Sequence, residues 1–408
     1  MPVSRAVRAV QSHCDAWLGW AYYPLICALL GAMALFTRWY AGKVTAEWEQ
    51  WVVADWLVSY APGFVRRGLS GELLLGVSRL TSAPANIVVW WTIVVVFVIF
   101  AVSLAALLWR KRLTFWYFVL CCSPAALLFA LYNPATVGRK EWLLFAAFAV
   151  WAMVLATRPL TRTLAVASGV AAAALTLMHE VFAFYSLYFV VLAYLSGRKD
   201  RQDSWPWAVM VPAGALVSLV AVLASPISLN ERSLCERLLQ VGAPVGVCEG
   251  LFEYRQLPPG QALAAAFSLP SRTIATGLAA ALVMVLMPVW CFAIANVPES
   301  AQRRRLLGGV LVAIIWSVPL FLVAVDWGRW IAIHATLTVL LCAALLPARK
   351  DPAAPRRLSP GALVSVAAGV LLLASMLAWS PKYCCGPDLL TDYTPVEAIV
   401  ATWEDFEF

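Results

Sequence analysis

Apolar residues occupy this chain in long continuous blocks that are separated by short polar breaks. The blocks do not alternate with polar positions, so they predict membrane helices and exclude a closed β-barrel. Most blocks approach the roughly 20 residues that a helix needs to cross the core of a bilayer. We expect eleven spans, at residues 21–40, 87–109, 113–132, 142–157, 163–178, 181–196, 205–224, 274–297, 307–325, 331–346 and 361–379.

Composition agrees with this pattern. Apolar residues make up 62% of the chain and charged residues only 13%, whereas about a quarter of a soluble domain is charged. The predicted fold class is an all-α polytopic membrane protein with about eleven transmembrane helices and a long first outward loop that carries interfacial helices. We expect a cytosolic segment at 1–20, a single bundle at 21–379 with outward loops at 41–86 and 225–273, and an outward tail at 380–408.

The basic residues orient the bundle. With the N-terminus in the cytosol, short loops rich in Arg and Lys alternate with outward segments along the chain, as the positive-inside rule requires. Residues 110–112, 303–305 and 356–357 are the clearest of these basic loops. We therefore predict a multi-pass protein of the cytoplasmic membrane with its N-terminus inside and its C-terminus outside. The net charge of +8 is then a signal of topology and no evidence for nucleic-acid binding.

Four of the ten cysteines fall on the predicted outer side, at Cys235, Cys248, Cys384 and Cys385. Disulfides persist in that environment, and four cysteines allow three pairings. A Cys235–Cys248 disulfide is the simplest of these, because it closes a single loop. None of the cysteines has the spacing of metal ligands, so no metal site is predicted from them.

The first outward loop carries charges that topology does not require. Residues 46–59 are expected to form an interfacial helix whose tryptophan-rich face also bears Asp55. Arg66 and Arg67 follow in a turn closed by Gly68. A carboxylate among aromatic rings, with two guanidinium groups nearby, favours a functional site. The alternative is an interfacial anchor whose charges face lipid headgroups.

Three further polar clusters lie at span ends on the same predicted side. They comprise Arg139, Lys140 and Glu141, then His179 and Glu180, and finally Asp326, Arg329 and His334. Ionisable groups at membrane depth are costly and usually face a cavity. Converging clusters would form a polar cavity that opens outward, with cations suited to phosphate. Each cluster also has a structural reading: Arg329 would pair with Asp326 in a surface bridge, and His179 would be a satisfied polar residue between helices.

The layout of the chain resembles the GT-C type of glycosyltransferase. Both have one span, a long outward loop with interfacial helices and an early acid, and then many spans with short loops. Those enzymes take sugar from a polyprenyl-phosphate donor on the outer side of the membrane, and similar polymerases and ligases of bacterial surface polysaccharides use outward Arg and His residues around a lipid diphosphate. The stretches Phe64-Val-Arg-Arg-Gly-Leu, Gly138-Arg-Lys-Glu and Asp326-Trp-Gly-Arg-Trp are similar to ones in bacterial membrane proteins of this sort.

The resemblance implies glycosyl transfer from a polyprenyl-phosphate-linked sugar, in assembly of the envelope or of a surface polysaccharide. Asp55 would be the base that takes the acceptor proton, with His179 or Glu180 as its competitor. The groups that would surround the lipid phosphate are Arg66, Arg67, Arg139, Lys140, Asp326, Arg329 and His334. No cofactor is predicted outright. A divalent metal stays open, because Asp55 stands alone where many GT-C members carry paired acids.

The expected partners are a lipid-linked sugar or oligosaccharide, membrane lipid and, for the acidic tail, envelope assembly proteins. The main alternative is a transporter or flippase of an anionic lipid-linked glycan, which would use the same basic cavity without a base. Ser123-Pro124 predicts a kink that widens the bundle near mid-depth. It has no clear counterpart elsewhere, which argues mildly against the paired broken spans of transporters. No Gly-rich phosphate loop occurs, so ATP-driven function of this chain alone is not expected.

Overall fold

Five helices in the described part of the chain are long and apolar enough to cross a membrane. They are α2 (Tyr22–Ala46), α5 (Ala85–Leu108), α12 (Met210–Ala224, whose span begins at Trp205), α18 (Ser300–Val323) and α19 (Trp327–Leu345). Shorter apolar helices lie between them, namely α8 (Glu141–Thr157), α9 (Arg162–Met178), α10 (Val181–Tyr185), α11 (Leu187–Ser196) and α17 (Met287–Asn296). The protein is therefore a helical, multi-pass membrane protein.

The computed structural model describes residues 2–46, 50–61, 63–133, 136–196, 205–224, 231–244, 282–323 and 326–348, with short pieces elsewhere. The remaining elements are α1 (Pro2–Leu18), α3 (Gln50–Leu57), α4 (Gly68–Thr81), α6 (Phe115–Cys121), α7 (Phe129–Tyr132), α13 (Glu231–Gln240), the π-helical turn η3 (Leu282–Leu286) and a two-residue pairing of β1 (Ser380–Pro381) with β2 (Leu390–Thr391). The expected span at 361–379, most of the tail, and Cys384 and Cys385 lie outside the described residues.

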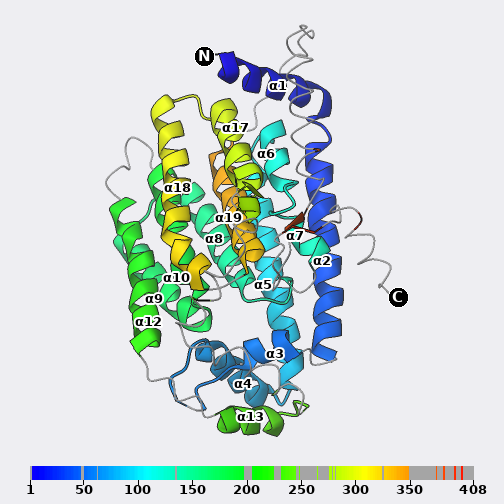
Figure 1. Ribbon diagram of the computed structural model, residues 1–408, viewed down its shortest axis with the longest axis vertical. Helices are drawn as coiled ribbons and strands as arrows, with labels where there is room; N and C mark the ends of the chain where they lie inside the picture. Colours follow the sequence, from blue (N-terminus) through cyan, green and yellow to red (C-terminus); the bar gives the residue numbers. More distant parts are fainter. Residues whose placement is uncertain are drawn as a thin grey trace.

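The two ends of the bundle differ in what covers them (Figure 1). Helix α1 lies across one end, while α3, α4 and α13 gather at the other. The sequence of α1 is amphipathic, and its apolar side chains Val7, Val10 and Cys14 are buried against the bundle. The indole of Trp116 donates to the Val7 carbonyl over 3.1 Å, which holds α1 against α6. The site described below lies toward the opposite end.

The first loop differs from the expected interfacial helix. Helix α2 continues to Ala46, and the next helix, α3, has only eight residues. Val52, Val53 and Leu57 are almost fully buried, because α3 packs between α4 and the bundle instead of lying along a membrane surface. Asp55 is thereby carried into the protein interior, where it needs charged or hydrogen-bonding partners.

The span expected at 113–132 is broken rather than kinked. Helix α6 ends at Cys121, residues 122–128 form turns, and α7 adds a single helical turn. Pro124 explains the break, since it lacks an N–H and its ring clashes with the preceding turn. The Ser123 hydroxyl donates instead to the Met284 carbonyl in η3 over 3.1 Å. Irregular backbone at membrane depth is tolerated where it is buried in protein or lines a cavity, and this segment does both.

Helix α13 is attached to the first loop by an ion pair. The guanidinium of Arg237 donates to both carboxylate oxygens of Glu72 on α4, over 2.7 and 2.8 Å. A disulfide joins Cys235 of α13 to Cys248, which is the pairing that loop closure favours in the sequence. The loop at 225–273 is thus connected to the loop at 41–86.

Candidate functional site

The polar clusters at the span ends meet in one connected set of ion pairs and histidine–carboxylate contacts. We call this set the ion-pair network and define it as Asp55, Arg66, Arg67, Lys140, Glu141, His179, Glu180, Asp326 and Arg329. It draws on α3 and the loop after it, the start of α8, the junction of α9 and α10, and the start of α19. These segments are far apart in the chain, so the network exists only in the packed bundle.

Arg67 is the centre of one half of the network. Its Nε and Nη2 donate to the two oxygens of Glu180 over 2.8 and 2.6 Å, and its Nη1 donates to Asp55 over 2.9 Å. The backbone of Arg67 is left-handed, with φ at 66°. A non-glycine residue in that region is strained and is found mostly where surrounding contacts over-determine it. The three charged hydrogen bonds of the Arg67 side chain hold the residue in this backbone conformation.

Asp55 lies between two cations rather than among aromatic rings alone. Beside Arg67, its second oxygen is 3.6 Å from the ammonium of Lys140. The Lys140 side chain is fully buried, donates to the Met178 carbonyl over 3.3 Å and lies 5.8 Å from the centre of the Trp56 ring. Asp55 therefore joins the loop after α3 to the start of α8 through these two cations.

The other half of the network is centred on Glu141. One of its oxygens lies 3.4 Å from Nε2 of His179 and 3.4 Å from Nε of Arg329. Arg329 also pairs with Asp326 at 2.7 Å and lies 4.3 Å from the centre of the Trp330 ring. The Nδ1 atom of His179 is 3.6 Å from Glu180, which joins the two halves.

The first half of the network holds its charges firmly. Burial alone would lower the pKa of Arg67, but Glu180 and Asp55 raise it well above its usual range. Burial would likewise raise the pKa of Glu180, but Arg67 and Arg66 hold it well below its usual range. Both groups are therefore charged at any physiological pH. A carboxylate with so low a proton affinity is a poor general base.

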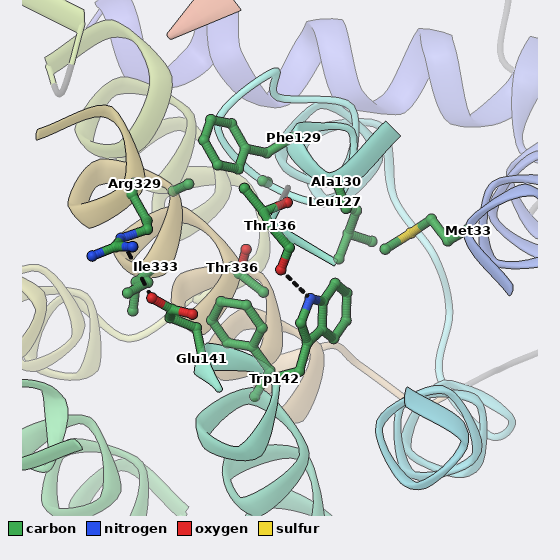
Figure 2. A pocket seen from close by; sticks show the side chains of 13 residues that line it. Met33, Leu127, Phe129, Ala130, Thr136, Glu141, Trp142, Arg329, Ile333 and Thr336 are labelled. Atoms are coloured by element: carbon green, nitrogen blue, oxygen red, sulfur yellow. Dashed lines mark hydrogen bonds and ion pairs between the residues drawn. The ribbon is translucent and has the colours of Figure 1, made fainter. Parts of the chain in front are cut away.

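A largely apolar cavity adjoins the second half (Figure 2). Its walls come from α2, the broken span, α8 and α19. The lining residues are Met33, Ala126, Leu127, Phe129, Ala130, Thr136, Glu141, Trp142, Phe145, Arg329, Ala332, Ile333 and Thr336. Figure 2 shows the Arg329–Glu141 pair on one side of the cavity and Met33 on the other. The cavity thus has a charged side and an otherwise apolar wall.

The remaining predicted residues are placed differently. Arg139 is partly buried and its charge acts on Glu141, while the side chain of Arg66 is half-exposed and 3.7 Å from Glu180. His334, which we expected at the site, lies elsewhere: its ring nitrogens are hydrogen-bonded to Tyr188 over 2.9 Å and Ser317 over 2.8 Å. Five residues along a helix correspond to a rotation of about 140°, so His334 points away from Arg329.

Glu141 belongs to one of the polar clusters seen in the sequence, but sequence reasoning gave it no role in the site. It follows Lys140 directly and opens a long apolar helix, so it looked like a helix-terminal charge. The available signal was its neighbour in the stretch Gly138-Arg-Lys-Glu, which places three charges together at a span end. Among the described residues, no three His, Cys, Asp or Glu side chains are placed to hold a metal ion.

Comparison with known proteins identifies a family. Residues 23–243, more than half of the chain, match the family described as Uncharacterised membrane protein Rv1490, and the chain belongs to that family. The matched region includes the network residues from Asp55 to Glu180 and ends before Asp326 and Arg329. No curated protein and no solved structure matches the chain.

Proposed function

We propose that this member of the Rv1490 family binds a polyprenyl-phosphate-linked sugar from the outer side of the cytoplasmic membrane and transfers its glycosyl group, in assembly of the envelope or a surface polysaccharide. The observation that carries this proposal is the position of Arg329 and Glu141. Both belong to the ion-pair network, and both line the apolar cavity. A lipid with an anionic head requires that combination, because apolar walls stabilise its chain and a guanidinium stabilises its phosphate.

The orientation and the eleven spans belong to the same proposal. Segments expected in the cytosol gather at the α1 end of the bundle: Asp15 accepts the Phe115 N–H over 2.7 Å, and Lys111 donates to the Leu346 carbonyl over 2.9 Å. Segments expected outside form the ion-pair network toward the other end (Figure 1). This separation supports a cytosolic N-terminus. The external C-terminus and the odd number of crossings rest on the sequence, because the expected span at 361–379 lies outside the described residues.

Three cations would bind the lipid phosphate. Arg329 borders the cavity, Arg139 is close to it through Glu141, and the half-exposed Arg66 faces the outside. As the glycosyl bond to phosphate breaks, negative charge grows on the departing oxygen, and guanidinium groups stabilise it. Arg67 and Lys140 would position the loop after α3 and would not contact the substrate, because neither is among the residues that line the cavity.

The proton of the acceptor hydroxyl must also be removed. Of the three candidate bases, His179 has the most suitable surroundings. Its Nδ1 makes no hydrogen bond within the described part of the chain. Its two ring nitrogens lie 3.4 Å from Glu141 and 3.6 Å from Glu180, which places a carboxylate on either side of the ring. Asp55 and Glu180 are each held by Arg67.

The test is reconstituted protein with a panel of polyprenyl-phosphate sugars, scored for a new glycosidic bond and for released polyprenyl phosphate. Arg329→Gln should reduce transfer about 10- to 100-fold, the equivalent of one charged hydrogen bond. His179→Gln should abolish transfer and leave donor binding in place. Arg79→Gln is the matched control, since Arg79 lies on α4 outside the network and donates to the Leu75 carbonyl.

Two results would contradict the proposal. In the first, Arg329→Gln transfers sugar like the wild type. In the second, the glycosylated lipid crosses the bilayer intact and no glycosidic bond forms, which would identify a flippase.

A further inference from the structure

Glu141 differs from the other acids of the ion-pair network in what it faces. Of Asp55, Glu141, Glu180 and Asp326, it alone lines the cavity. Glu141 is only 5% exposed, and neither of its carboxylate oxygens has a hydrogen-bond partner in the described part of the structure. Arg329 and His179 approach to 3.4 Å, which is an ion-pair distance without hydrogen-bond geometry. Buried hydrogen-bond acceptors nearly always have a donor, so we expect a hydrogen-bond donor next to the Glu141 carboxylate.

Two hydrogen-bond donors in the described cavity wall near Glu141 are already bound to backbone carbonyl groups. The Trp142 indole beside Glu141 donates to the Thr136 carbonyl over 3.0 Å (Figure 2). The Thr136 hydroxyl itself donates to the Asn133 carbonyl over 2.8 Å. Most of the remaining lining is apolar carbon. An ionised carboxylate offers about four acceptor positions, and Glu141 lines the cavity beside Arg329.

We infer that Glu141 receives hydrogen bonds from the sugar hydroxyls of the lipid-linked donor, while Arg329 binds the donor's phosphate and the lipid chain lies along the broken span at residues 126–130. This inference rests on the proposed function and names the group that recognises the sugar. Hydroxyl groups are the donors that a carboxylate accepts from. Glu141 is a binding residue in this assignment, and no bond is made to it.

The same geometry distinguishes the glycosylated lipid, which is the substrate, from the bare polyprenyl phosphate, which is the product. A sugar places hydroxyl donors next to Glu141, whereas bare polyprenyl phosphate brings an additional negative charge and no hydroxyl groups. Like charges near each other in a poorly solvated site repel strongly. Glu141 should therefore favour the glycosylated donor over the lipid phosphate that remains after transfer, which promotes release of the product.

The experiment measures binding of polyprenyl phosphate and of polyprenyl phosphates that carry a hexose or a pentose, by native mass spectrometry of the full chain. The quantity of interest is the ratio of glycosylated to bare lipid bound. Glu141→Gln should lower the wild-type ratio about tenfold or more, because a charged hydrogen bond and the repulsion of bare phosphate are both lost. Glu141→Asp keeps the charge but withdraws it from the cavity, and should lower the ratio less.

Asp326→Asn is the matched control. It also removes one acid from Arg329, at 2.7 Å, but Asp326 does not line the cavity. It should change the binding of both lipids alike and leave the ratio unchanged. Thermal melting of each variant shows whether it folds. If Glu141→Gln does not fold, the ratio measured for Glu141→Asp tests the inference.

The inference is overturned if Glu141→Gln and Glu141→Asp keep the wild-type ratio, or if Asp326→Asn lowers it equally. If that happens while the wild type still transfers sugar, the proposed function stands and only the role of Glu141 falls. If the wild type forms no glycosidic bond and binds glycosylated and bare lipid equally, both proposals fall.

Discussion

Arg67 and Glu180 are 113 residues apart in the chain and form a two-pronged ion pair, with Nε 2.8 Å from Oε2 and Nη2 2.6 Å from Oε1. The pair joins the loop after α3 to the junction of α9 and α10. Fork-to-fork pairing of Arg with a carboxylate is among the strongest side-chain interactions, and its planar geometry fixes the orientation of both partners. The loop after α3 is therefore attached to the bundle at a defined place.

Removal of Arg67 should be costly. Arg67→Ala leaves Glu180 and Asp55 buried without their main cation, so we expect a loss of about 3–5 kcal/mol in the free energy of unfolding. Arg67→Lys keeps the charge but loses the fork and should fall in between. The half-exposed Arg66 is the control, and Arg66→Ala should cost about 1 kcal/mol or less. Equal effects of the two alanine variants in denaturant titration would contradict this account.

Helix α4 requires glycine at one position and tolerates a side chain at another. A Cβ on Gly71 would lie 2.1 Å from the Val58 carbonyl oxygen, which is backbone and cannot swing away. Gly71→Ala should destabilise the protein by about 1–3 kcal/mol. A Cβ on Gly76 of the same helix meets nothing within 4 Å, so Gly76→Ala should be neutral or stabilising by up to about 1 kcal/mol. Melting temperatures of the two variants test the difference, and similar values would refute it.

Attachment of α13 should depend on pH. Burial raises the pKa of Glu72, but hydrogen bonds from Arg237 and from the Tyr60 N–H outweigh it, so the pKa is lowered overall. A lowered carboxyl pKa contributes stability at neutral pH, which is lost as the pH falls through the folded-state value. Hydrogen exchange in α13 should therefore quicken at acidic pH. Glu72→Gln should show fast exchange already at neutral pH and no acid step; a step of wild-type size in this variant would assign the effect to another group.

Asp15 should give the opposite pH dependence at the α1 end. Burial raises its pKa to about 6, against the lowering effects of the Phe115 N–H, Arg112 and the Tyr22 hydroxyl. A raised pKa means that stability falls as the pH rises through about 6, since a buried carboxylate must then ionise. The melting temperature of the wild type should drop between pH values below and above that point, relative to Asp15→Asn. Parallel profiles of the two proteins would show that Asp15 does not titrate there.

Local sequence properties predicted several parts of this protein well. Long apolar blocks predicted a helical membrane protein. The hydropathy summed over about 20 residues reflects the free energy of moving a whole helix from water into the bilayer core. Pro124 predicted a disturbance in the third span, although the structure shows a break rather than a kink. The spacing of Cys235 and Cys248 favoured the disulfide that the structure contains. Each of these features depends on residues that are close in the chain.

The sequence by itself determined the class of the protein and which charged residues lie at span ends; only the tertiary structure decided how those charges are partnered. Arg67 with Glu180, and Arg329 with Glu141, are pairs set by the packing of helices that are distant in sequence. The same packing turned Glu141 toward the cavity and His334 toward Tyr188. The physical reason is that hydropathy adds up along a chain, whereas an ion pair depends on the distance and direction between two side chains, which relative helix positions and rotations determine.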